Sequence, residues 1–137
     1  MTLPEIRIDP KADRTPSEQL IQQVCFAIAA GALSEGERLT SVRALSAEAS
    51  INPNTIGKAW RDLERLGVLE SRPGDGVFVA HGAIVLAREA RDAQLDAELG
   101  RWVEAAASSG LAIHEIERCF RRALESVRDR RRLGESA

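Results

Sequence analysis

The sequence predicts a mainly α-helical (α+β) fold in which one small β-hairpin accompanies several helices. Two segments, Thr15-Pro16 and Asn52-Pro53, combine a capping side chain with a proline at the first helical position, which is typical of helix starts. The turn-forming run Pro73-Gly74-Asp75-Gly76 separates two apolar segments and predicts a hairpin. From Ala83 onward the chain is rich in Ala, Arg, Glu and Leu, which favours long helices.

The first elements along the chain are a predicted strand and a predicted helix. Residues 5–9 alternate polar and apolar side chains, the period of a half-buried strand, and Pro10 ends this pattern. Thr15 then provides a capping hydroxyl, and Glu18 lies three residues later, where its carboxylate completes a capping box. Apolar residues at helical spacing extend to Ile28, so we expect a helix over residues 16–30.

Two short helices are predicted next. After Arg38-Leu39, which is long enough only for an extended bridge, Ser41 can cap a helix that ends near Ser50. A third helix begins at Asn52-Pro53 and ends before Gly67, and its apolar face is formed by Ile56, Ala59, Trp60, Leu63 and Leu66. Two short helices joined by about three residues form a helix-turn-helix.

A hairpin and two further helices complete the chain. Strands are expected at residues 68–72 and 77–80, on either side of the turn. One long helix runs from residue 83 to about residue 108, and a second, over residues 113 to about 130, folds back on it. Together these elements predict an N-terminal winged helix-turn-helix over residues 1–80 and a C-terminal two-helix dimerisation hairpin over residues 81–137.

Composition narrows the function classes. Nineteen Lys and Arg against twenty-one Asp and Glu give a formal charge of −2, so any nucleic-acid face must be local rather than a product of bulk charge. The two cysteines, Cys25 and Cys119, lack metal-ligand spacing, and no catalytic motif occurs, so we expect no metal, no cofactor and no enzyme. The unpaired cysteines fit a reducing compartment, and no apolar run approaches the roughly 20 residues that span a bilayer, so we expect a cytoplasmic protein without membrane contact.

The predicted third helix carries residue types that read DNA. Its apolar positions hold one face to the core, and the 100° step per residue directs the polar positions elsewhere. Asn54 can pair with adenine, Thr55 can touch a thymine methyl or a phosphate, and Lys58 can meet guanine or phosphate. Arg61 and Arg65 follow on the same polar side. The chemistry of this helix is therefore that of groove recognition.

Several motifs in order carry a family resemblance: Gly36–Leu45, Asn52–Thr55, Leu63–Arg72 and Gly74–Val79. With these motifs, residues 15–80 resemble the DNA-binding domain of GntR-family bacterial repressors. Most of the family begins the third helix with Ser-Arg-x-Thr, whereas Asn52-Pro53-Asn54-Thr55 resembles the YtrA-like subfamily. Only residues 81–137 follow, which is too few for the large effector domains of other branches and resembles a short dimerisation tail.

The resemblance and the apolar stripes together give two sets of site residues. By resemblance, Arg43, Asn54, Thr55, Lys58 and Gly74 match positions that contact DNA in the family, and Arg61 and Arg72 are further candidates. The two tail helices carry more apolar surface than a lone hairpin can cover, which predicts a homodimer interface. The interface residues are Leu95, Leu99, Trp102, Ile116, Phe120 and Leu124.

Each of these interpretations has a simpler alternative. Lys58, Arg61 and Arg65 are also what a solvated helix surface carries, and Arg43 can serve as a surface ion-pair partner. Turn geometry alone can explain Gly74. For Gly74 the two interpretations are compatible, because the same glycine can shape the turn of the hairpin and approach DNA.

The function predicted from these residues is sequence-specific DNA binding without catalysis. We expect a homodimeric transcriptional repressor that binds an inverted-repeat operator in double-stranded DNA. An unidentified small-molecule effector is left open, and it would sit between subunits because two helices cannot enclose a ligand alone. The alternative is a winged-helix protein-interaction module that does not bind DNA.

Overall fold

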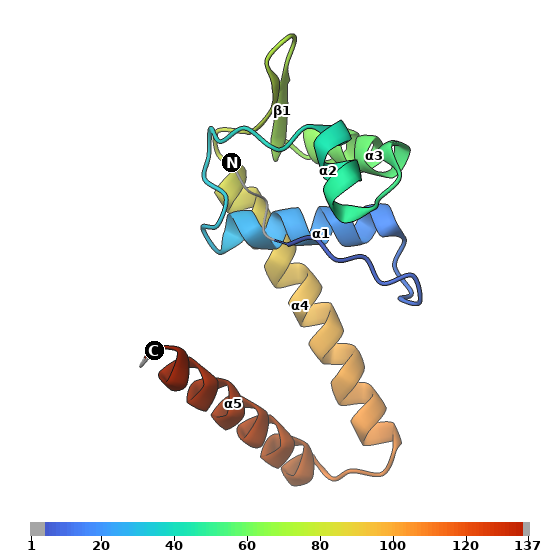
Figure 1. Ribbon diagram of the computed structural model, residues 1–137. Helices are drawn as coiled ribbons and strands as arrows, with labels where there is room; N and C mark the ends of the chain where they lie inside the picture. The colour runs from blue at the N-terminus through green and yellow to red at the C-terminus, as the bar shows by residue number, and fades with distance from the viewer. Residues whose placement is uncertain (1–4, 136–137) are drawn as a thin grey trace. The chain divides into compact units, whose positions relative to one another are not determined.

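The computed structural model describes residues 5–135 and has the predicted mainly helical architecture with a two-stranded antiparallel sheet (Figure 1). The elements in chain order are α1 (Pro16–Ala29), α2 (Val42–Ala49), α3 (Pro53–Arg65), β1 (Leu69–Arg72), β2 (Gly76–Val79), α4 (Ala83–Ser108) and α5 (Ile113–Glu135). The chain divides into two compact units, one up to Gln94 and one from Leu95 onward, so the division lies within α4. The functional division between residues 1–80 and 81–137 stays a prediction.

The predicted helix caps are present. The Glu18 N–H donates to Thr15 Oγ1 at 3.2 Å and the Thr15 N–H donates to Glu18 Oε2 at 3.0 Å, which completes the capping box of α1. Ser41 Oγ accepts from the N–H of Ala44 at 3.1 Å at the start of α2. Side-chain oxygens thus satisfy N–H groups that have no partner inside these helices.

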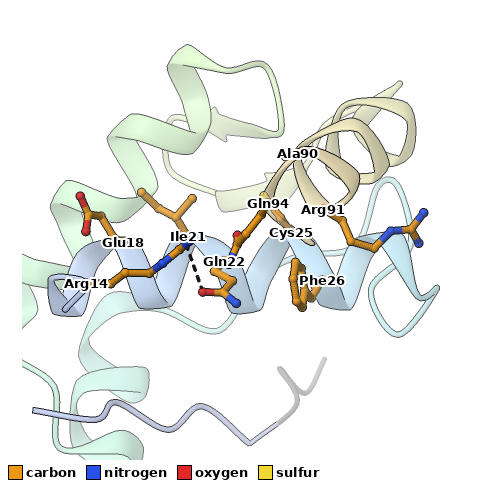
Figure 2. Close-up of a pocket in the computed structure, with 9 residues that line it drawn as sticks. All are labelled: Arg14, Glu18, Ile21, Gln22, Cys25, Phe26, Ala90, Arg91 and Gln94. Atoms are coloured by element: carbon orange, nitrogen blue, oxygen red, sulfur yellow. Dashed lines mark hydrogen bonds between the residues drawn. The ribbon is translucent and has the colours of Figure 1, made fainter. Parts of the chain in front are cut away.

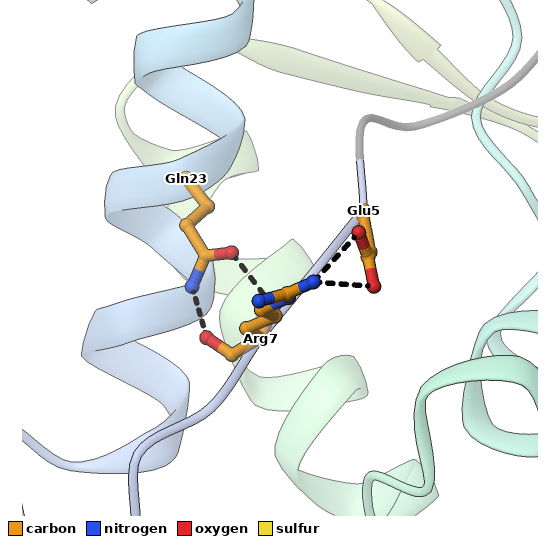
Figure 3. A network of polar contacts seen from close by, with 3 residues as sticks. All are labelled: Glu5, Arg7 and Gln23. Carbon is orange, nitrogen blue, oxygen red and sulfur yellow. Dashed lines mark hydrogen bonds and ion pairs between the residues drawn. The ribbon is translucent and has the colours of Figure 1, made fainter.

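The predicted strand over residues 5–9 is wrong. This segment is irregular and binds α1 through amide side chains: the Arg7 N–H donates to Gln23 Oε1 at 3.0 Å, and Gln23 Nε2 donates to the Arg7 carbonyl at 2.7 Å (Figure 3). Gln19 does the same at Asp9, whose N–H donates to Gln19 Oε1 at 2.9 Å. Because glutamine side chains take up these backbone groups, the segment does not need a neighbouring strand.

The hairpin pairs Leu69 with Val79 and Arg72 with Gly76, so its strands differ by about one residue from the predicted ranges. Arg38 forms an isolated bridge with Phe78, and the Leu39 N–H donates to the Val77 carbonyl at 2.8 Å. The short extended bridge predicted at Arg38-Leu39 is therefore confirmed, and it pairs with strand β2 of the hairpin.

The core of the N-terminal unit collects one face each of α1 and α3, the inner side of the hairpin and the first turns of α4. Its largest fully buried side chains are Leu20, Ile28, Leu33, Ile56, Leu63, Val24, Val68 and Val79. Ala83 and Ala87 of α4 are also fully buried in this cluster. Leu66, which the pattern placed on the apolar face of α3, is exposed because the helix ends at Arg65 and Leu66 is its C-cap.

The start of α4 is joined to the N-terminal unit by polar contacts as well. The Ile84 N–H donates to Glu35 Oε1 at 3.3 Å, and His81 Nδ1 lies 3.5 Å from Glu35 Oε2. Backbone N–H groups of Gly82 and Ile84 hold the pKa of the Glu35 carboxyl below its usual range. Arg88 Nε donates to the Ala29 carbonyl at 3.4 Å, so α4 begins on the winged helix rather than on a free linker.

In the C-terminal unit, α4 and α5 pack together near their connecting turn. The rings of Trp102 and Phe120 meet edge to face with centroids 5.0 Å apart, and Ala106 and Ile116 are buried. The helix α5 runs to Glu135, past the predicted end near residue 130. No helix within residues 5–135 is long and apolar enough to cross a membrane.

Candidate nucleic-acid interface

The two sides of α3 differ in burial as the sequence predicts. Ile56, Ala59, Trp60 and Leu63 are buried against the core. On the opposite side Asn54, Lys58, Arg61 and Arg65 are exposed, and Thr55 is half-buried. One helix therefore presents an amide, a hydroxyl and several cations together, which are the groups that pair with base edges and phosphates.

The first turn of α3 lies beside the start of α1. A shallow depression of about 310 Å³ is lined by Thr15, Pro16, Ser17, Asn54, Thr55 and Lys58. The structure thus brings three of the predicted DNA contacts together in one place. The N–H groups at a helix start and the Lys58 ammonium both favour a negatively charged neighbour.

Arg43 lies on a different element from the α3 residues. It is the second residue of α2, directly after the Ser41 cap, and its side chain is exposed. Within residues 5–135, no carboxylate lies at salt-bridge distance from Arg43, Lys58 or Arg61. These three cations therefore keep their charge available to a partner outside the chain.

Two other predicted cations are already paired. Arg65 Nη1 lies 3.1 Å from Asp62 Oδ1, and Arg72 Nε lies 3.8 Å from Glu70 Oε1. The Arg72 guanidinium also stacks over the Phe78 ring, 4.1 Å from its centroid. Both guanidinium groups are therefore held by contacts within the chain, although both side chains remain accessible.

The hairpin of β1 and β2, which is the wing of the winged helix, supplies a glycine turn and one cation that the sequence pattern did not indicate. Gly74 has φ +81°, and a Cβ there would meet nothing within 4 Å, so its backbone conformation rather than space requires glycine. Gly76 differs, because a Cβ built there would lie 2.9 Å from Nε of Arg38. Arg38 therefore lies directly along the wing and is exposed. The sequence signal that could have indicated Arg38 is its position in the predicted extended bridge, which pairs with β2.

The predicted dimer residues divide into two groups. Leu95, Leu99, Trp102 and Leu124 are between 45% and 56% exposed, which is high for large apolar side chains. Ile116 is buried and Phe120 is half-buried by the contact with Trp102. The first group forms an uncovered apolar surface, and the second holds the hairpin together.

A second depression, of about 340 Å³, lies between α1 and the first turns of α4 (Figure 2). Its lining residues are Arg14, Glu18, Ile21, Gln22, Cys25, Phe26, Ala90, Arg91 and Gln94. Burial raises the pKa of the Cys25 thiol to about 11, so the thiol stays protonated and unreactive at neutral pH. Arg14 Nη1 donates to Gln22 Oε1 at 3.4 Å across one side of the depression.

Comparison with known proteins identifies the family. The model of the "Bacterial regulatory proteins, gntR family" matches residues 16–79, which run from the start of α1 to the end of β2. The HTH-type transcriptional repressor YtrA of Bacillus subtilis (strain 168) is 31% identical over 111 residues, which cover 81% of this chain and 85% of YtrA. The chain belongs to the GntR family.

Solved structures of similar proteins have the same fold as this GntR-family chain, and one of them is a YtrA protein. A transcriptional regulator from Oenococcus oeni has a TM-score of 0.67 and 27% identity, covering 85% of this chain and 97% of its own. YtrA from Sulfolobus acidocaldarius, a GntR-family transcription factor, has a TM-score of 0.54 and 27% identity, covering 57% and 82%. The chain is thus a GntR-family transcriptional regulator with a DNA-binding domain.

Every predicted DNA contact of this GntR-family protein, from Arg43 to Gly74, lies within the range that the family model matches. The predicted dimer residues lie outside that range, in α4 and α5. The individual roles of both sets stay predictions.

Proposed function

We propose that this protein is a homodimeric transcriptional repressor that binds an inverted-repeat operator in the cytoplasm. The observation that carries the proposal is the outer face of α3, where Lys58 and Arg61 are exposed and have no carboxylate partner among residues 5–135, beside Asn54 and Thr55. The repressor role is proposed because the similar protein YtrA from Bacillus subtilis is named a transcriptional repressor.

The proposed contacts divide into base readout and phosphate binding. Asn54 and Thr55 stand in the first turn of α3, the part of a recognition helix that reaches base edges. Lys58 and Arg61 lie one and two turns further along and contact bases or phosphates. Arg43 at the start of α2 binds the DNA backbone, and Gly74 and Arg72 bring the wing to the adjacent groove.

The dimer is proposed to form through the uncovered apolar surface of Leu95, Leu99, Trp102 and Leu124. A second copy related by a two-fold axis would bury this surface against itself. The same axis would place two copies of α3 on one face of the duplex. Half-sites are then spaced by about one helical turn, roughly 10 base pairs, or a multiple of it.

Any small-molecule effector is proposed to bind between subunits. Two helices alone can contact a ligand on few sides, whereas ligand pockets usually surround their ligand. Calorimetry with a dimer and a monomeric variant tests this, because an effector bound between subunits loses its affinity when the subunits separate.

Selection from a random library of duplexes tests the proposed function. The unmodified protein should enrich an inverted repeat, and protection of both half-sites should be seen by footprinting. The competing function, a winged-helix protein-interaction module without DNA binding, would enrich no sequence and would protect no site.

A further inference from the structure

A glycine in the middle of α3 stands out because the fold gives no reason for it. Gly57 is the fifth residue of a 13-residue helix and has no left-handed backbone angle that would require glycine. Glycine is among the least favourable residues in a helix interior, because it loses the most backbone freedom on folding.

Packing does not require glycine at this position either. A Cβ built on Gly57 would meet one neighbour within 4 Å, the Nη1 atom of Arg61, at 3.4 Å. That distance is an ordinary contact, and the atom is the end of a flexible side chain. Alanine would therefore fit and would stabilise the helix.

The position of Gly57 relates it to DNA rather than to the core. The helical step places residue 57 on the half-exposed flank of α3, next to the exposed Arg61 and away from buried Ile56 and Ala59. Thr55 and Lys58 line the depression beside α1, and Gly57 and Arg61 occupy the other flank. The Arg61 guanidinium, whose Nη1 lies 3.4 Å from the Cβ position of Gly57, thus lies over bare helix backbone at this point.

We propose that Gly57 is a specificity-determining position, where the absence of a side chain lets the Arg61 guanidinium lie against the α3 backbone and lets a base edge approach both. Glycine serves this purpose wherever a backbone must come close to a ligand. The inference rests on the proposed DNA-binding function and deepens it. It assigns Arg61 to base readout, and it identifies a position where a larger side chain would alter the sequence that is recognised.

The test is a size series, Gly57→Ala and Gly57→Leu, measured on the operator that the unmodified protein selects. Both variants should unfold at a Tm about 2 °C or more above that of the unmodified protein, because both residues are better helix formers than glycine. Operator affinity should nevertheless fall from Gly to Ala to Leu, by at least about fivefold for Leu, the lower limit for one good base contact. Repeating the selection with Gly57→Leu should change the preferred base at one position in each half-site.

Gly100→Ala is the matched control, because Gly100 also lies inside an exposed helical segment, in α4, with nothing within 4 Å of its Cβ position. This variant should gain stability without losing operator affinity. Unchanged affinity and base preference in Gly57→Leu would overturn the inference, as would an equal loss on operator and unrelated duplex, which would assign the effect to phosphate contacts. An unmodified protein that selects no sequence would instead contradict the proposed function itself.

Discussion

Lys58 and Arg43 are cations on two different helices, and within residues 5–135 neither has a carboxylate partner. We expect Lys58→Ala and Arg43→Ala to weaken operator binding without lowering Tm. For a phosphate contact, the slope of log affinity against log salt should flatten by about 0.9, and affinity for all sequences should fall alike. For a base contact, the preference at one position should relax instead. Electrophoretic titration at several salt concentrations separates the two.

Arg65→Ala is the matched control for these substitutions. Arg65 is exposed on the same side of α3 but is paired with Asp62 at 3.1 Å, so its removal should affect binding less. Equal affinities for the unmodified protein, Lys58→Ala and Arg43→Ala would show that DNA does not bind this face.

Glu35 gives a prediction about pH. Its pKa is lowered in the folded protein, first by the backbone N–H groups of Gly82 and Ile84. A group with a lowered folded pKa stabilises the fold above its unfolded pKa and loses that contribution as pH falls through the folded pKa. Glu35→Gln should therefore lower Tm at neutral pH, and the difference should vanish in acid, below the ordinary glutamate range. Thermal unfolding over this pH range checks it, and a pH-independent difference would contradict it.

At the scale of single residues, the sequence indicated which side chains of α3 are exposed, but it did not indicate which charged side chains form contacts within the chain. The 3.6-residue period separates Lys58 from Ile56. It does not show that Asp62 holds Arg65 or that Phe78 holds Arg72, because rotamers decide those contacts. Arg38 was missed because its position along the wing depends on pairing between residues far apart in sequence.

At the scale of elements, local signals predicted what local chemistry determines. The capping box at Thr15 and Glu18 is contained within four residues, so the start of α1 could be predicted from the sequence. Residues 5–9 have the alternation of a strand, but a strand also needs a neighbouring strand to pair with. Here the backbone groups of the segment hydrogen-bond to the side chains of Gln19 and Gln23 instead. The burial of Ala83 and Ala87 could not be predicted from the sequence, because it depends on where α4 packs.

The packing of α4 predicts how the chain responds to truncation. A chain that ends after Gln94 keeps Ala83 and Ala87 in the core and should fold as a monomer that binds half-sites weakly. A chain that ends after Ala80 loses both buried methyl groups, and its free energy of unfolding should be lower by roughly 2 kcal/mol. Urea denaturation of the two fragments measures this difference. Equal stability would mean that α4 contributes nothing to the N-terminal core.

At the scale of the whole molecule, the uncovered apolar surface predicts dimer formation. Trp102→Ala should weaken the dimer by about 2 kcal/mol or more, as truncation of a buried aromatic anchor commonly does. Phe120→Ala should act in the same direction, because Phe120 holds the ring of Trp102 at 5.0 Å. Sedimentation equilibrium measures both dissociation constants. Glu125→Ala, at an exposed polar position of α5, is the control and should leave the dimer unchanged.

Sedimentation velocity of the selected operator with the unmodified protein decides whether two chains bind one operator. We expect a fluorescent duplex carrying both half-sites to move as a complex with two protein chains at micromolar concentration. A duplex with one half-site should bind far more weakly. A single chain bound to the full operator, or a protein that remains monomeric while protecting both half-sites, would contradict the proposed homodimer.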